Sequence, residues 1–116
     1  MSEDIIITQN RKYCVGIRIR RGQGYYYLDG HEKLVFGIKR FAYNNTYLLR
    51  KVLTREDYDA ELDAYLLRLS SDETDLETGE CFYDVALERR DRGLERIIGC
   101  TPMEIRRSVV RSGGVE

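Results

Sequence analysis

Residues 70–88 read SSDETDLETGECFYDVALE, and this stretch decides the fold. Its first half is an acidic turn that leads through Leu76 to a corner at Gly79. Its second half alternates, with Tyr83, Val85 and Leu87 on one side and polar or small residues between them. Successive side chains of a strand point to opposite faces, so this run predicts a strand with one buried face. A strand entered through a short corner is typical of a small antiparallel sandwich.

Four residues form the expected structural corner: Thr74, Leu76, Gly79 and Tyr83. Side-chain oxygens of the acidic turn are expected to cap this corner, as turn residues of these types commonly do. The Tyr83 hydroxyl is expected to bind back to the preceding corner, as in the tyrosine corner of sandwich folds.

Other stretches of the chain repeat the same alternation. Residues 13–20 place four apolar residues on one face, and residues 33–39 place Leu34, Phe36 and Ile38 inward. Shorter β-rich runs lie at 5–8, 25–28 and 47–52, with turns at 21–24, 29–30, 44–45 and 90–93. A strand at 94–99 and renewed pairing at 103–105 are expected around Pro102, which marks an edge or a bulge because it cannot donate a hydrogen bond. The chain is therefore expected to be all-β, an antiparallel β-sandwich of about seven or eight short strands.

Residues 54–69 permit two interpretations. Thr54 could cap a helix whose apolar residues follow at helical spacing. Residues from Ala64 onward also alternate as a strand does. We favour a loop with one helical turn at 55–58, followed by a strand from Ala64. With this segment, residues 1–110 form a single domain, and residues 111–116 form a flexible tail.

Composition restricts the function classes. The 116 residues carry a net charge of −1, which disfavours binding to bulk nucleic acid or an anionic membrane through overall charge. No apolar stretch reaches about 18 residues, and the N-terminus lacks the basic region of a signal peptide. Cys14, Cys81 and Cys100 form no CxxC pair and have one histidine for company, so a zinc site is not expected. They are interpreted as buried or half-buried free thiols, with a Cys14–Cys81 bridge as the alternative.

The sequence contains none of the common catalytic motifs, so we expect no enzyme, no catalytic residue, no cofactor and no metal. His31 follows Asp29 and Gly30 in a turn and is interpreted as an exposed loop residue. The acidic residues around 72–77 lack the spacing of an EF-hand calcium loop.

A basic and aromatic cluster is the main candidate interaction surface. Its members are Arg18, Arg20, Arg21, Tyr25, Tyr26 and Tyr27. Such residues could bind single-stranded nucleic acid, or they could form a solvated sheet face with arginines stacked on tyrosines. Met103 and Ile105 of the final strand are the second candidate contact surface, because an edge strand can pair with another chain.

Three pieces of the chain, taken in order, resemble a known family. They are IIITQNRKYCVGIRIR at 5–20, YYYLDGHEKLVFGIKR at 25–40, and LRLSSDETDLETGECFYDVALE at 67–88 followed by LERIIGCTPMEI at 94–105. Over about residues 4–106 the chain resembles the immunoglobulin-like β-sandwich domains of tailed-phage structural proteins, in particular the N-terminal domain of upper baseplate (receptor-binding) proteins. The most specific matching positions are Asp72, Glu73, Thr74, Leu76, Gly79, Tyr83, Asp84, Val85 and Gly99.

This resemblance implies a structural role in a phage or prophage tail or baseplate. The expected partners are other phage structural proteins, in a homo-oligomer or another symmetric assembly, with no membrane partner and no favoured nucleic acid. The expected location is the virion, assembled in the bacterial cytoplasm. Larger members of the family continue into receptor-binding segments, whereas this sequence ends, so an adaptor or stand-alone component is expected. The alternative functions are a nucleic-acid-binding or regulatory β-domain and a carbohydrate-binding module.

Overall fold

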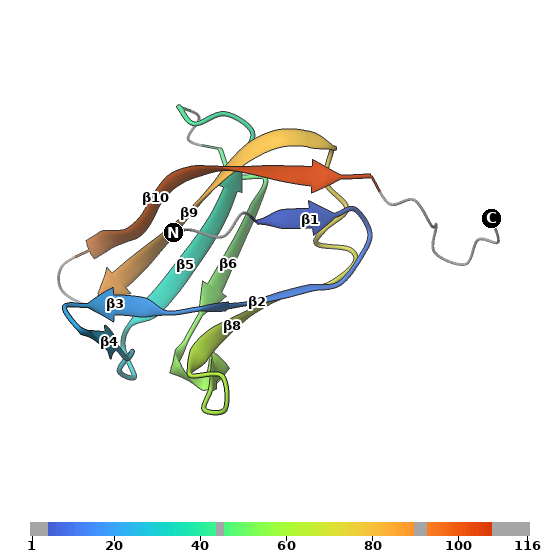
Figure 1. Ribbon diagram of the computed structural model, residues 1–116. Coiled ribbons are helices and arrows are strands. Elements are labelled where there is room, and N and C mark those ends of the chain that lie inside the picture. The colour runs from blue at the N-terminus through green and yellow to red at the C-terminus, as the bar shows by residue number, and fades with distance from the viewer. Residues whose placement is uncertain (1–4, 44–45, 90–92, 108–116) are drawn as a thin grey trace.

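The computed structural model describes residues 5–43, 46–89 and 93–107, and these form an all-β, sandwich-like domain (Figure 1). The large sheet has the order β1-β10-β9-β5-β6. Its strands are β1 (Ile6–Thr8), β10 (Gly93–Arg106), β9 (Gly79–Arg89), β5 (Lys33–Lys39) and β6 (Leu49–Leu53). A second sheet has the order β2-β8-β7, with β2 (Tyr13–Ile17), β8 (Ala64–Leu69) and β7 (Tyr58–Asp59). β3 (Ile19–Arg21) and β4 (Gly24–Tyr26) form a separate hairpin.

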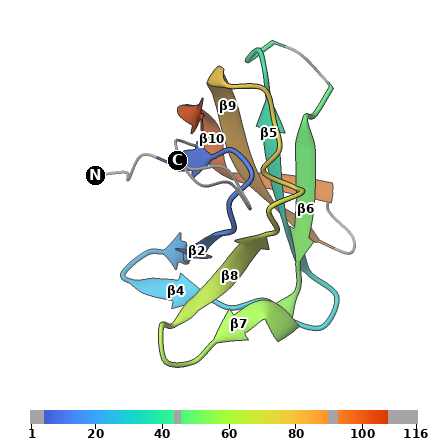
Figure 2. The ribbon, with the colours of Figure 1, turned by 90° about the vertical axis from the view of Figure 1, so that its right-hand side faces the viewer.

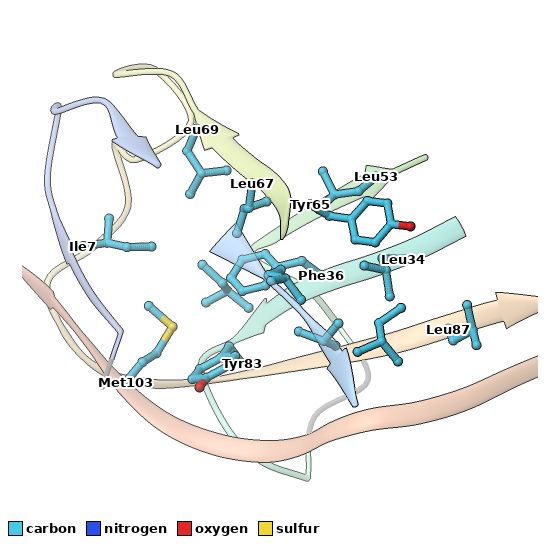
Figure 3. Packing of buried hydrophobic residues seen from close by; sticks show 14 of the residues in the cluster. Ile7, Leu34, Phe36, Leu53, Tyr65, Leu67, Leu69, Tyr83, Leu87 and Met103 are labelled. Carbon is cyan, nitrogen blue, oxygen red and sulfur yellow. The ribbon is translucent and has the colours of Figure 1, made fainter. Parts of the chain in front are cut away.

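The two larger sheets lie as layers with the core between them (Figure 2). Phe36 of β5 and Tyr83 of β9 stack near its centre, with ring centroids 6.0 Å apart (Figure 3). Leu67 of β8 and Ile7 of β1 close the cluster from other strands, and both are fully buried. The inward positions predicted at 33–39 and 83–88 are confirmed, because Leu34, Phe36, Ile38, Tyr83, Val85 and Leu87 are all buried in this core. The expected solvated face is not formed here, because Val35 and Asp84, which alternate with these residues, are also buried.

The 54–69 segment forms the favoured loop and strand. The Thr54 side chain caps the 3₁₀ turn η1 (Arg55–Asp57), and the Asp57 carboxylate accepts from the Thr54 backbone N–H at 2.8 Å. β8 begins at Ala64, as predicted. This reciprocal capping satisfies the backbone groups of one turn only, and the following β7–β8 hairpin then takes the chain into the sheet.

Several boundaries differ from the prediction. The run at 13–20 divides at Arg18, because the chain leaves its pairing with β8 and begins pairing with β4. The two expected C-terminal strands form one strand, β10, which has register shifts on both sides of Ile98. Pro102 lies just beyond the second shift, in agreement with its expected place at a bulge. In all, ten strands form within the described ranges, which exceeds the expected seven or eight.

The sheet is also not purely antiparallel. β1 runs parallel to β10, with Ile7 opposite Ile105. A parallel pair needs a long connection, and here almost the whole chain lies between the two strands. The predicted turn at 44–45, most of the turn at 90–93, the domain end at 110 and the tail at 111–116 lie outside the described residues.

Candidate interaction surfaces

The corner predicted at Thr74 is built as a hydrogen-bonded junction. Thr74 is fully buried, and its hydroxyl donates to the Arg11 carbonyl at 2.7 Å and accepts from the Arg11 N–H at 3.0 Å. Ser70 and Glu73 cap the turn reciprocally, each backbone N–H donating to the other's side chain. The Glu73 carboxylate also pairs with Lys51 at 2.8 Å, and the Lys51 ammonium holds the pKa of Glu73 below its usual value. The corner therefore joins the β1–β2 turn to β6, and its role is to stabilise the fold.

The other predicted corner residues lie in the same region. Leu76 packs partly buried against the core, and its carbonyl accepts from the Gln9 side-chain amide at 2.8 Å. Gly79 begins β9 with φ of +122°, a conformation that glycine adopts without steric strain. Tyr83 packs its ring on Phe36, and the proposed bond from its hydroxyl to the corner stays a prediction.

Met103 and Ile105 do not form a contact surface. The prediction is wrong because both side chains point into the core, where their exposed fractions are 5% and 1%. β10 is an interior strand at this point, flanked by β9 on one side and β1 on the other. The exposed residues of this segment are its alternate positions, Pro102 and Glu104.

Arg18 is held by the β7–β8 turn. Its guanidinium donates to the carbonyls of Leu62 and Asp63 at 2.6 and 3.0 Å. The hydroxyls of Tyr27 and Tyr58 both donate to one Asp63 carboxylate oxygen, at 2.9 and 2.5 Å. These bonds lower the pKa of Asp63 and raise the pKa of Tyr58 to about 12, because each favours the charged carboxylate and the protonated phenol. Arg18 and Tyr27 therefore fasten a hairpin.

Arg21 and Tyr26 belong to a second network. Arg21 pairs with Glu95 of β10, and Arg89 of β9 pairs with the same carboxylate at 2.9 Å. Both guanidinium groups also lie near the Tyr26 ring, 5.5 and 5.7 Å from its centroid. Its hydroxyl donates to the buried Glu32 carboxylate at 2.5 Å, and this bond raises the pKa of Tyr26. The network fastens the β3–β4 hairpin to the large sheet.

Arg20 and Tyr25 remain as the outward-facing pair of the predicted cluster. They are register partners across β3 and β4, and the guanidinium lies 5.6 Å from the ring centroid. Both are exposed. The interpretation of the cluster as a sheet face with arginines stacked on tyrosines fits the contacts of Arg20 and Arg21.

The most exposed aromatic residue, Tyr43, lies elsewhere, in a group that sequence reasoning missed. Phe41 and Tyr43 follow β5, are 49% and 85% exposed, and stack on one another at 5.6 Å. Tyr47 and Leu48 precede β6 and are about as exposed as Phe41. We call these four residues the aromatic tip. The available signal is the density of aromatic residues on both sides of the Asn-Asn pair in FAYNNTYLL.

A groove of about 500 Å³ lies on the outer side of β1 and β10, near the start of β9. Its lining includes Ile6, Pro102, Met103, Glu80, Glu104 and Arg106. Ile6 is 37% exposed and lies opposite Glu104 in the parallel pair. We call this feature the β1 groove.

The three cysteines lie in different environments. Cys81 is buried, which raises the pKa of its thiol, whereas Cys14 and Cys100 are exposed, in contrast to the expected burial. All three are free thiols, so the alternative Cys14–Cys81 bridge is not formed. Across the described ranges, no group of three or more His, Cys, Asp and Glu side chains is arranged to hold a metal ion. In the same ranges, no helix has the length and hydrophobicity that a membrane crossing requires.

Comparisons with protein-family models, with curated proteins and with solved structures find no match to this chain.

Proposed function

We propose that this chain is a non-enzymatic structural component of a phage or prophage tail or baseplate, acting by protein–protein assembly. The observation that carries the assembly role is the aromatic tip. Tyr43 is 85% exposed and Phe41 49% exposed, although both are large and apolar. Aromatic residues are enriched in the cores of protein interfaces, where partner surfaces cover them. The virion context is supported by the sequence resemblance over about residues 4–106.

The sheet edges also suit assembly. β1 and β6 are the outer strands of the large sheet, and β1 has only three residues. An outer strand presents backbone groups to which another chain can pair. Many copies on a symmetric particle would multiply weak contacts of this kind. Other phage structural proteins are therefore the proposed partners.

The test is the composition of purified particles. After prophage induction of the source bacterium, particles are separated on a density gradient and each fraction is analysed by mass spectrometry. We expect this chain to follow the tail proteins through the gradient at a constant ratio, while an abundant host enzyme, the carry-over control, does not. Complete particles that lack the chain, with all of it in the soluble lysate, would overturn the proposal.

The nucleic-acid alternative has less support from the contacts. Arg18 is engaged by backbone carbonyls and Arg21 by Glu95, so two of the three cluster arginines are occupied. Arg20 over Tyr25 is the pair that could still stack with a base. A gel-shift assay with single-stranded DNA at low salt distinguishes the two functions. A shifted protein–DNA band that disappears as the salt concentration rises would favour the nucleic-acid alternative.

A further inference from the structure

The aromatic tip is an exposed apolar projection, which we also call the knob. The Phe41 and Tyr43 rings are nearly parallel, at 17°, so they support each other. Tyr47 at the base lies directly over Gly37, where an added Cβ would approach its ring to 2.2 Å. Side chains that already pack on one another lose less conformational freedom when a partner covers them.

The knob carries positive charge at its base. The Lys39 ammonium lies 5.0 Å from the Tyr47 ring centroid, and Arg50 is exposed on β6, opposite Gly37. Among the described residues, neither Lys39 nor Arg50 forms a salt bridge. A surface that covers the knob is therefore expected to supply carboxylates.

The β1 groove has the complementary character. Ile6 and Pro102 supply its exposed apolar lining, and Glu80 and Glu104 supply carboxylates. Within the described part of the chain, the Glu80 side chain forms no salt bridge, and Glu104 pairs only with exposed Arg106 at 3.4 Å. The groove volume of about 500 Å³ falls in the range of pockets that hold small-molecule ligands.

Knob and groove are neighbours on one molecule. Arg40, the residue before Phe41, donates to the carbonyl of Glu80 at 3.0 Å. The aromatic tip therefore begins beside the groove, at the end of the sheet where β5 finishes and β9 starts (Figure 1). Two adjacent complementary patches can be exchanged between two copies about a single two-fold axis.

We infer that the aromatic tip of one copy occupies the β1 groove of a second copy, and that the exchange is reciprocal in a closed dimer. Each contact joins aromatic rings to Ile6 and Pro102, and Lys39 to Glu80. This inference deepens the proposed assembly function. Only the place of the dimer in a phage particle depends on that proposed function. The self-association itself is a property of the purified chain.

The first test is sedimentation equilibrium of the full chain from micromolar to millimolar concentration. We expect a monomer–dimer equilibrium, and for Tyr43→Ala a dissociation constant raised by at least about tenfold, as for a central interface residue. Leu94→Ser is the matched control, because Leu94 is 66% exposed at the other end of β9 and β10. Equal dissociation constants for Tyr43→Ala and the wild-type chain, or a monomer at every concentration, would overturn the inference.

The second test uses charge exchange. The variants K39E and E80K should each dimerise more weakly than the wild type, because each places two like charges at the contact between residues 39 and 80. Mixed in equal amounts, they should form a dimer with one copy of each, visible by native mass spectrometry. No mixed dimer, or K39E and E80K dimers as stable as the wild type, would overturn the assigned contact. Far-UV circular dichroism checks that each variant is folded.

These results separate this inference from the proposed function. A strictly monomeric chain that still follows tail proteins in the gradient would overturn the dimer alone. A dimer that is missing from complete particles would overturn the virion role alone.

Discussion

Thr74 gives the most direct test of how the corner holds the two layers together. Its hydroxyl forms two hydrogen bonds with the backbone of Arg11, a residue 63 positions away in the sequence. The Ser71 carbonyl, at 3.1 Å, is a second acceptor for the same hydroxyl proton. The side chain is fully buried. Removing the hydroxyl therefore weakens a contact between distant segments without touching the central core.

Two substitutions divide the contribution of this side chain. Thr74→Ser keeps the hydroxyl and removes a buried methyl group, which costs about 1 kcal/mol of unfolding free energy. Thr74→Ala removes both, and two hydrogen bonds contribute about 1–3 kcal/mol. The Arg11 N–H keeps a second acceptor in the Thr8 carbonyl at 3.2 Å, so the lower part of that range is expected. Thr74→Ala should thus cost about 2–3 kcal/mol in total.

Equilibrium unfolding in urea measures both variants against the wild type, with an unchanged m-value as the check on two-state behaviour. The difference between the alanine and serine variants isolates the hydroxyl, because both lack the methyl group. Amide hydrogen exchange at Arg11 adds a local readout, with faster exchange in Thr74→Ala and no change in Thr74→Ser. A difference below about 0.5 kcal/mol between the two variants would refute the reasoning.

Three further predictions concern the core, the hairpin and the tyrosine corner. Phe36→Ala should lower the unfolding free energy by about 3–5 kcal/mol, whereas Val52→Ala, a control on the outer face, should change it by less than about 0.5 kcal/mol; comparable losses in urea unfolding would contradict the assigned core. Hydrogen bonds from the Tyr58 and Tyr27 hydroxyls lower the pKa of Asp63 from 3.8 in the folded protein. The ionised Asp63 carboxylate therefore stabilises the fold fully above pH 3.8, and this contribution is lost as the pH falls through the lowered pKa of the folded state. The stability difference between wild type and Asp63→Asn should therefore shrink as the pH falls below that value, and a difference that stays constant with pH would exclude this linkage. Tyr83→Phe should lower the melting temperature if the hydroxyl binds the corner, and an unchanged value would remove that role.

Local alternation predicted the buried faces well. Leu34, Phe36 and Ile38 are every second residue of the strand, and the strand period alone places them on one side. The choice at 54–69 was also local, because the Thr54 cap and the alternation from Ala64 both lie within a few residues. Interactions between residues this close in the sequence can be predicted from the sequence pattern.

Non-local pairing explains the errors. Met103 and Ile105 alternate as core residues should, yet they were assigned to a contact surface because the strand was expected at an edge. β1, from the other end of the chain, covers that edge. In the same way, the sequence predicts Arg18 as a binding residue, because its hydrogen-bond acceptors, the carbonyls of Leu62 and Asp63, are more than 40 positions away. Backbone acceptors give no signal in composition or spacing.

The exposure of the aromatic tip was also difficult to predict from the sequence. Tyr43 and Tyr65 are both tyrosines next to alternating apolar runs, yet one is 85% exposed and the other 3%. Tyr43 lies in the connection between β5 and β6, after β5 has ended at Lys39. Tyr65 instead begins β8, and its hydroxyl accepts from the buried Leu28 N–H at 2.6 Å. Exposure of an aromatic residue is decided by where the sheet ends.

A reciprocal dimer would also protect the weakest edge of the fold. β1 is a three-residue edge strand, and short edges limit unwanted pairing without abolishing it. A knob seated in the β1 groove would cover the exposed side chain of Ile6 on that strand. The dimer would use both knobs and both grooves, so growth into a larger symmetric assembly requires another surface. The exposed Arg20–Tyr25 pair and Leu94 are two surfaces outside the knob and the groove that meet this requirement.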